Sequence, residues 1–195
     1  MLKKMALIAV CTASAFAMHT GEININDADL EVSAKFDVGQ FNQNVEPDTM
    51  FIGGKFLKAS GDHSSVKGAD LDPYFELNFK LQKEINNSGV FLGMGMKLNY
   101  TENYSTLPLG LEFAYRIPAK DFVPMYLHGE LYYAPGALAF SDAKDYLEYR
   151  IGYDIEIIDN GSITLGYRNM DTNYDNSVRD FTYNESWYAG FKIKF

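Results

Sequence analysis

The sequence of 195 residues is poor in cysteine and in basic residues. It contains one cysteine, Cys11, and 17 Lys and Arg against 26 Asp and Glu, which gives a formal net charge of −9. A single cysteine excludes an internal disulfide and, with only three histidines, argues against a zinc site. The acidic balance argues against nucleic-acid binding, because that depends on neutralising phosphates with Lys and Arg.

Long hydrophobic runs are also absent. No stretch of about 20 apolar residues occurs, so no transmembrane helix is expected. The most apolar segment, Met5 to Phe16, follows Lys3 and Lys4 and ends at Ala15-Phe16-Ala17. A short positive start, an apolar run and a small-x-small site are typical of a secretory signal peptide. We therefore expect residues 1–17 to be a cleaved signal peptide and residues 18–195 to form the exported domain.

Cys11 lies within this expected signal peptide. The bulky Val10 before it argues against a lipoprotein, since a small residue would be wanted there. The exported domain is then expected to contain no cysteine, which excludes thiol chemistry in it.

The rest of the sequence alternates between apolar and polar residues with a period of two, as in β-strands. Leu147, Tyr149 and Ile151, for example, alternate with Glu148 and Arg150. The 14 Tyr and 14 Phe also favour pleated structure. The expected strands are 22–27, 30–38, 49–58, 73–85, 89–101, 106–117, 123–134, 144–158, 161–170 and 185–195. We expect about ten strands, with eight as the alternative, and most approach the roughly 9–11 residues that a tilted strand needs to cross a bilayer.

The connections between these segments alternate in length. Those at 86–89, 118–122 and 159–161 are short, whereas those at 59–72, 135–143 and 171–184 are long and polar. Short turns on one side and long loops on the other are typical of transmembrane β-barrels. The sequence therefore predicts an all-β fold, an antiparallel up-and-down transmembrane β-barrel. Two connections fit less well: 39–48 is long for the turn side, and the one near Asp27 is short for the loop side.

Alternation alone does not say which face lies inside. A soluble barrel hides its apolar face, whereas a membrane barrel exposes it to lipid. Aromatic residues favour the membrane arrangement, because on the apolar face they gather near the strand ends, where membrane interfaces would lie. The aromatic girdle expected on the loop side comprises Tyr100, Tyr133, Tyr149, Tyr167 and Trp187.

The last strand also favours the membrane arrangement. Phe191, Ile193 and Phe195 share its apolar face, and the chain ends on Phe195. A terminal Phe on an alternating strand resembles the signal that outer-membrane assembly machinery recognises. We therefore expect these three residues to form a C-terminal assembly signal.

The polar face carries nearly as many acids as bases, although the whole chain is acidic. Such a balance suits a narrow lumen, where desolvated charges must be paired. The sequence therefore predicts a charge network inside the barrel. Its expected members are Lys97, Glu112, Arg116, His128, Glu130, Glu148, Arg150, Arg168, Lys192 and Lys194.

From about residue 107 onward the chain resembles the YfaZ family of small outer-membrane proteins. The residues that carry the resemblance are Gly129-Glu130-Leu131-Tyr132-Tyr133-Ala134-Pro135, Asp145 to Arg150, Gly166-Tyr167-Arg168 and the closing strand to Phe195. Before residue 107 the strands fit the family only in pattern. The resemblance implies an outer-membrane location and a barrel fold, and it transfers no catalytic residue.

Candidate chemistry is sparse. His128 and Glu130 share the polar face and could act as base and orienter, but same-face neighbours lie about 7 Å apart, and no nucleophile motif accompanies them. His63 is expected to be solvated in its loop and His19 to be disordered. The stretch Asp171 to Asn176 alternates possible Ca²⁺ ligands without the glycine and distal glutamate of an EF-hand loop. We therefore expect no catalytic residue, metal site or cofactor.

The function that these observations favour is a non-enzymatic outer-membrane barrel, either structural or a narrow channel with a mostly plugged polar lumen. Its expected partners are the lipid bilayer, lipopolysaccharide and the assembly machinery, while any small solute or ion is unidentified. Two alternatives remain open at this point. One is an outer-membrane enzyme that modifies lipid or lipopolysaccharide, and the other is a soluble periplasmic barrel that binds a ligand.

Overall fold

The computed structural model describes residues 19–118, 123–141, 143–174 and 180–195. The expected signal peptide, 1–17, lies outside the described residues, as does part of the possible Ca²⁺ stretch, at 175 and 176. Within the described ranges, no helix is long and apolar enough to span a membrane.

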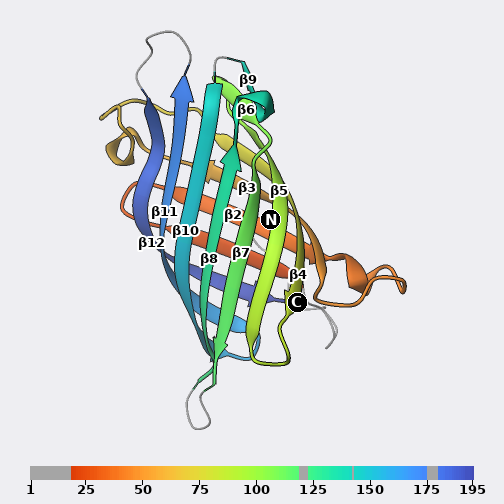
Figure 1. Cartoon of the computed structure of the whole chain (residues 1–195). Coiled ribbons are helices and arrows are strands. Elements are labelled where there is room, and N and C mark those ends of the chain that lie inside the picture. The colour runs from red at the N-terminus through yellow and green to blue at the C-terminus, as the bar shows by residue number, and fades with distance from the viewer. Residues whose placement is uncertain (1–18, 119–122, 142, 175–179) are drawn as a thin grey trace, which may run out of the picture.

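Ten long strands form a closed antiparallel barrel (Figure 1). They are β1 (Thr20–Ile25), β2 (Leu30–Asp37), β3 (Met50–Lys58), β4 (Tyr74–Glu84), β5 (Val90–Tyr100), β7 (Leu109–Ile117), β8 (Met125–Ala134), β10 (Ala143–Ile158), β11 (Gly161–Tyr174) and β12 (Phe181–Lys194). Each pairs with its neighbours along the chain, and β1 pairs with β12 to close the ring. The prediction of ten strands in an up-and-down barrel is confirmed.

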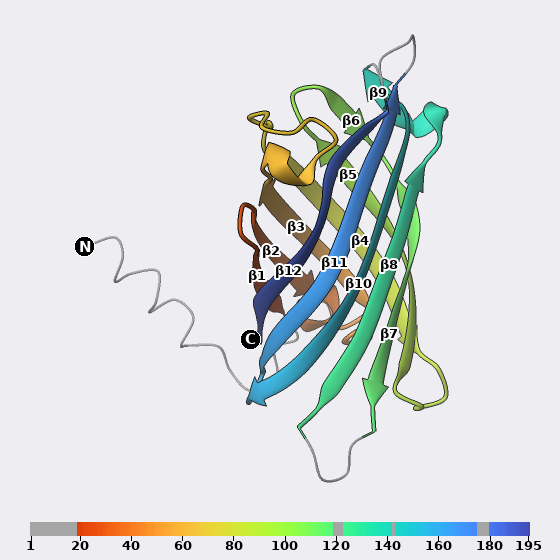
Figure 2. The same cartoon turned by 90° about the vertical axis from the view of Figure 1, so that its left-hand side faces the viewer.

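The connections define two ends of the barrel (Figure 2). The loop end carries the long connections 59–73, 101–108 and 135–142 together with the short turn 26–29, and the turn end carries the C-terminus, short connections such as 85–89 and 159–160, and the long connection 38–49. Two short strands, β6 (Tyr104–Thr106) and β9 (Ala139–Ser141), pair with each other and extend the wall above β5 at the loop end. Three 3-10 helices, Val38–Gln40, Gly61–His63 and Gly136–Leu138, lie in connections.

The tight turns are built by residues that tolerate a left-handed backbone. Asn86 and Asn87, with φ of 51° and 52°, and Gly89, with φ of 78°, turn the chain between β4 and β5. Asn160, with φ of 62°, does the same between β10 and β11. Asn and Gly reach this region at little cost, which explains why these connections can be so short.

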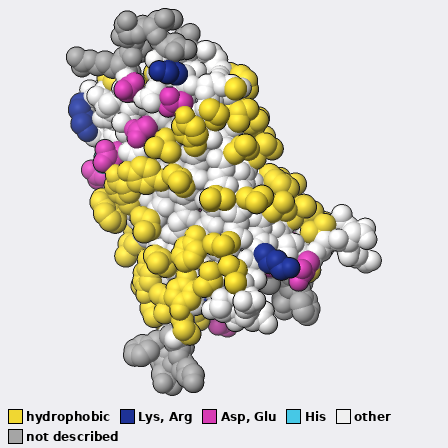
Figure 3. Space-filling view, in the orientation of Figure 1, with side chains coloured by type: hydrophobic (Ala, Val, Ile, Leu, Met, Phe, Trp, Pro, Cys, Tyr) yellow, Lys and Arg dark blue, Asp and Glu magenta, His cyan; other side chains and the backbone are white. Residues whose placement is uncertain are grey.

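The apolar face of the barrel points outward. Leu77, Met94 and Leu111 are 61–65% exposed, whereas Glu31, Lys97 and Glu148, which point inward, are 0–2% exposed. Hydrophobic side chains cover much of the wall in Figure 3, with the charged ones gathered toward the ends. This inverted distribution is that of a transmembrane barrel and the opposite of a soluble one.

Among the described residues, a buried apolar cluster lies inside the barrel at its loop end. Its centre is a set of four tyrosines, Tyr74, Tyr104, Tyr146 and Tyr183, each 0–2% exposed, which we call the tyrosine cap. Leu57, Leu71 and Met170 pack with them. The interior is therefore aromatic at the loop end and charged below it.

Candidate functional site

Two arginines anchor the charged interior. Arg168 on β11 places one guanidinium nitrogen 3.2 Å from Asp29 Oδ2 and another 3.0 Å from Glu31 Oε2. Arg150 on β10 makes a two-pronged contact with the same Glu31, at 2.9 and 2.6 Å, and its Nε donates to Glu148 at 3.1 Å. Arginine favours such planar, forked contacts with carboxylates. Glu31 on β2 therefore accepts hydrogen bonds from two arginines, which lie on β10 and β11.

Two lysines continue the pattern. Lys97 Nζ on β5 lies 3.0 Å from both Glu130 and Glu148 and 3.6 Å from Glu76. It also lies 4.0 Å from the centre of the Tyr132 ring. Lys55 Nζ on β3 lies 2.9 Å from Glu76 and 3.5 Å from Glu148. Both ammonium groups thus bridge carboxylates from different strands.

Together these groups form one connected set, which we call the central lattice. It consists of Asp29, Glu31, Lys55, Glu76, Lys97, Glu130, Glu148, Arg150 and Arg168. Five acids face four bases, and eight of the nine side chains are at most 5% exposed. Charges buried to this degree are tolerable only when they are paired.

The central lattice crosses the lumen. In the ring of ten strands, β3 and β10 are five steps apart in either direction, so they are opposite each other. Lys55 and Glu148 meet from these two strands. Arg150 and Glu31, from β10 and β2, bridge almost the same span. Side chains of the central lattice therefore meet from opposite walls at this level.

Two smaller polar groups lie nearer the turn end. Asp154 accepts from Lys192 at 2.7 Å and from Thr164 at 2.7 Å, and it lies 3.3 Å from His128 Nε2. Lys80 Nζ lies 3.3 Å from Glu112, which also accepts from the Tyr132 hydroxyl at 2.6 Å. The side chains of Lys80, Glu112, His128 and Lys192 are 14–23% exposed, which places them closer to solvent than most of the central lattice.

Six strands thus bring most of the predicted network residues inside. Lys97, Glu130, Glu148, Arg150 and Arg168 belong to the central lattice, and Glu112, His128 and Lys192 to the turn-end groups. Two predicted members lie outside both sets. Arg116 is 52% exposed and 3.6 Å from Glu84, and Lys194 lies over the Tyr126 ring at 4.8 Å.

Sequence reasoning missed Asp29 and did not select Glu31, Lys55, Glu76 or Asp154. Strand parity had placed the last four on the polar face, but nothing in the sequence distinguished them as partners of the selected residues. Asp29 had no such signal, because it lies in the turn between β1 and β2. The Asn26 side chain accepts from the backbone amides of Ala28 and Asp29 there and holds the turn that aims Asp29 inward.

The environment of Asp29 favours its charged form. Burial opposes ionisation, but the Ser60 amide, the side chains of Asn26 and Asn184, and the Arg168 guanidinium outweigh it. The pKa of Asp29 is therefore held below its ordinary value of 3.8.

Two expectations about histidines were wrong. His63 is not simply solvated, since its ring contacts Asp29 at 3.0 Å and Asp27 at 3.3 Å. His19 is ordered: its Nδ1 accepts from the Asp37 amide, and its backbone pairs with that of Phe195. His128 belongs to a polar group, as expected, and its partner there is Asp154 on the neighbouring strand. Within the described ranges, no cluster of three or more candidate ligands could hold a metal ion.

The expected girdle residues lie on the outer face toward the loop end. Tyr100, Tyr133, Tyr149 and Trp187 are 38–73% exposed. The Tyr149 and Tyr167 rings are 6.1 Å apart, and those of Tyr167 and Trp187 are 5.2 Å apart. At the other end of β12, Phe191 faces outward and the Phe195 amide donates to His19.

An apolar exterior and an ion-paired interior define a β-barrel of the transmembrane class. The chain belongs to the YfaZ family: the family model, described as "YfaZ precursor", matches residues 2–195. The resemblance expected from about residue 107 onward thus extends over nearly the whole chain. A search of curated proteins finds no match.

Several solved structures are similar in fold at low sequence identity. The "KdgM porin" is 9% identical, with a TM-score of 0.47, over 91% of this chain and 98% of that one. The same porin in complex with disordered oligogalacturonate is 10% identical, with a TM-score of 0.46, over the same shares. A triple mutant of the Rhodopseudomonas blastica porin is 10% identical, with a TM-score of 0.35, over 86% of this chain and 44% of that one.

Proposed function

We propose that the protein is a non-enzymatic outer-membrane barrel whose lumen is closed to solutes. The observation that carries this proposal is the meeting of Lys55 and Glu148 from opposite walls. The tyrosine cap adds a second, aromatic layer at the loop end. Barrels of about eight strands have an interior just filled by side chains, whereas porins of about sixteen to eighteen strands leave an aqueous channel. With ten strands and an interior of paired charges, this barrel is close in size to barrels whose interior is filled by side chains.

An outer-membrane location is supported by the outward apolar face and by the N-terminal export pattern. Lipid contacts the wall, and lipopolysaccharide contacts the aromatic girdle at the loop end, which then faces outward. Removal of residues 1–17 accompanies export, leaving 18–195 as the barrel. Phe191, Ile193 and Phe195 act as the signal for the assembly machinery.

A structural role fits the interior better than catalysis. A catalytic carboxylate or histidine needs a free partner in reach of a substrate, whereas the charged groups of the central lattice are paired with one another.

Conductance in planar lipid bilayers tests the closed lumen. Purified wild-type protein, folded as judged by heat-modifiable migration on gels, is expected to give no large, stable current steps. The double variant Lys55→Ala/Lys97→Ala leaves Glu76 and Glu148 without their lysines, so water should enter and a cation-selective leak should appear. Arg116→Ala, at the exposed turn end, is the matched control and should behave as wild type.

Large, stable current steps from the wild type would contradict a closed lumen and would indicate a narrow channel instead. A change in the lipid or lipopolysaccharide profile of cells producing the wild type, lost in His128→Ala, would favour the enzymatic alternative. Recovery in osmotic-shock fluid would favour a soluble barrel.

A further inference from the structure

A small cavity lies at the loop end, directly above the tyrosine cap. Its volume is about 70 Å³, which is room for roughly five to seven water molecules. The walls come from three separate parts of the chain: the connection before β4, the segment from the end of β5 into β6, and the start of β12. The cavity is therefore formed only when the barrel has closed.

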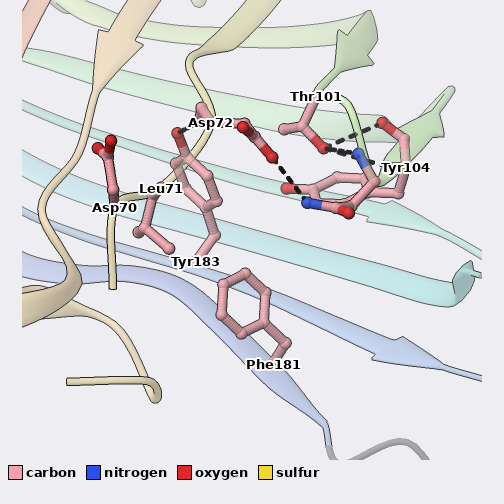
Figure 4. Close-up of a pocket in the computed structure, with 8 residues that line it drawn as sticks. Asp70, Leu71, Asp72, Thr101, Tyr104, Phe181 and Tyr183 are labelled. Atoms are coloured by element: carbon pink, nitrogen blue, oxygen red, sulfur yellow. Dashed lines mark hydrogen bonds between the residues drawn. The ribbon is translucent and has the colours of Figure 1, made fainter. Parts of the chain in front are cut away.

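Aromatic rings make up much of the wall. Tyr104 and Tyr183 are each 2% exposed and belong to the tyrosine cap, and Phe181 packs against Tyr183 with their ring centres 6.3 Å apart. Figure 4 shows these rings around the cavity, with Asp72 beside them. Ring faces carry negative partial charge and attract cations.

The charged groups that line the cavity, Asp70 and Asp72, are both acidic. Asp70 is bound by Lys58 at 3.0 Å. Asp72 accepts from the Asn103 amide at 2.9 Å, and in the part of the chain that the structure describes no basic side chain pairs with it. The cavity thus holds one carboxylate whose charge is not neutralised by an ion pair among the described residues.

Several hydrogen-bond donors around the cavity are already engaged. The Tyr183 hydroxyl donates to the Asp72 carbonyl at 2.6 Å, and the Thr101 hydroxyl donates to the Tyr104 carbonyl. The Asn103 amide donates to Asp72. Among the described residues, the Tyr104 hydroxyl is not engaged in this way, but it is buried. An anion needs free donors at the cavity surface, whereas a cation needs acceptors and ring faces, so the lining favours a cation.

We propose that this cavity binds the head group of a small organic cation, an alkylammonium, at the outer surface of the closed barrel. The Asp72 carboxylate supplies the countercharge, and Tyr104, Phe181 and Tyr183 supply cation–π contacts and apolar surface. Because Tyr104 and Tyr183 of the tyrosine cap line the cavity, the ligand binds at the cap and does not enter the charged interior.

Ligand-observed NMR with tetramethylammonium as the probe tests this proposal on the full barrel in detergent micelles. The wild type should give saturable binding, on the order of 1 mM for so small a cation. Asp72→Asn keeps an acceptor for Asn103 but removes the charge, and it should weaken binding about tenfold or more. Phe181→Leu should weaken binding by a smaller factor.

Asp62→Asn is the matched control, because it removes one negative charge from an exposed loop residue that does not line the cavity. It should leave binding within about twofold of wild type, as expected for a screened surface charge. Inorganic phosphate should not compete. The proposal is overturned if the wild type shows no saturable binding, if Asp62→Asn weakens binding as much as Asp72→Asn, or if phosphate competes with the probe.

Discussion

Lys55 and Glu148 stand on opposite strands of the barrel, and their Nζ and Oε1 atoms are 3.5 Å apart. Neither side chain is more than 5% exposed. A contact between opposite walls ties the barrel together across its axis, in addition to the hydrogen bonds around its circumference. The groups that we propose close the lumen therefore also link opposite walls of the barrel.

Arg150→Ala is expected to destabilise the barrel by about 3 kcal/mol or more, because it leaves Glu31 and Glu148 buried without one of their partners. Arg116→Ala, whose side chain is half exposed, should cost about 0.5 kcal/mol or less. Urea unfolding in lipid vesicles, followed by fluorescence, measures both. Equal costs for the two variants would contradict the buried pairing of Arg150.

Asp29→Asn should cost about 2 kcal/mol at neutral pH, because Asp29 accepts charge-assisted hydrogen bonds from Arg168 and others. The pKa of Asp29 is lowered on folding, so its contribution is fully present above the ordinary value of 3.8 and is lost as pH falls through the lower folded value. The stability difference between wild type and variant should therefore shrink below about pH 4. A difference that stays constant to pH 2 would be evidence against a charged Asp29.

Asp48→Asn should stabilise the barrel at neutral pH. Burial and the nearby Asp37 raise the pKa of Asp48 above 3.8, despite Lys80 and Lys194. The folded state therefore disfavours the charged form, and this penalty appears as pH rises above 3.8. Asn also keeps the acceptor for Gln82 and suits the φ of 61°. The unfolding midpoint should rise by a few degrees at pH 7 and match wild type at pH 3; a fall at pH 7 would contradict the argument.

Gly110→Ala should destabilise the barrel by about 1–3 kcal/mol. A Cβ at Gly110 would collide with the Leu131 carbonyl and the Tyr132 ring, and Tyr132 supports Lys97 and Glu112. Gly54→Ala is the control, since its Cβ would meet its nearest atom at an ordinary 3.5 Å. Unfolding in urea again measures the free energy of unfolding of both variants. A loss of stability in Gly54→Ala as large as that in Gly110→Ala would refute the packing argument.

The sequence was sufficient to predict the barrel because period-two alternation and turn residues act locally. Strand parity also placed Lys97, Glu148 and Arg168 inside. It could not give their partners, because these depend on how the sheet closes: Arg150 and Glu31 are 119 residues apart. Asp29 could not be predicted to face inward, because a residue in a turn has no strand parity. The cavity at the tyrosine cap could not be predicted either, because its walls come from three segments that are distant in the sequence.

Trp187 allows the most direct test of the orientation of the wall, in which the apolar face contacts lipid and the charged face lies inside the barrel. It is the only tryptophan of the chain, and it lies on the outer wall, 73% exposed. In vesicles its emission should be blue-shifted and strongly quenched by lipids that carry bromine or nitroxide near the headgroup, and weakly by aqueous acrylamide. Strong acrylamide quenching with no response to the lipid quenchers would contradict a lipid-facing wall.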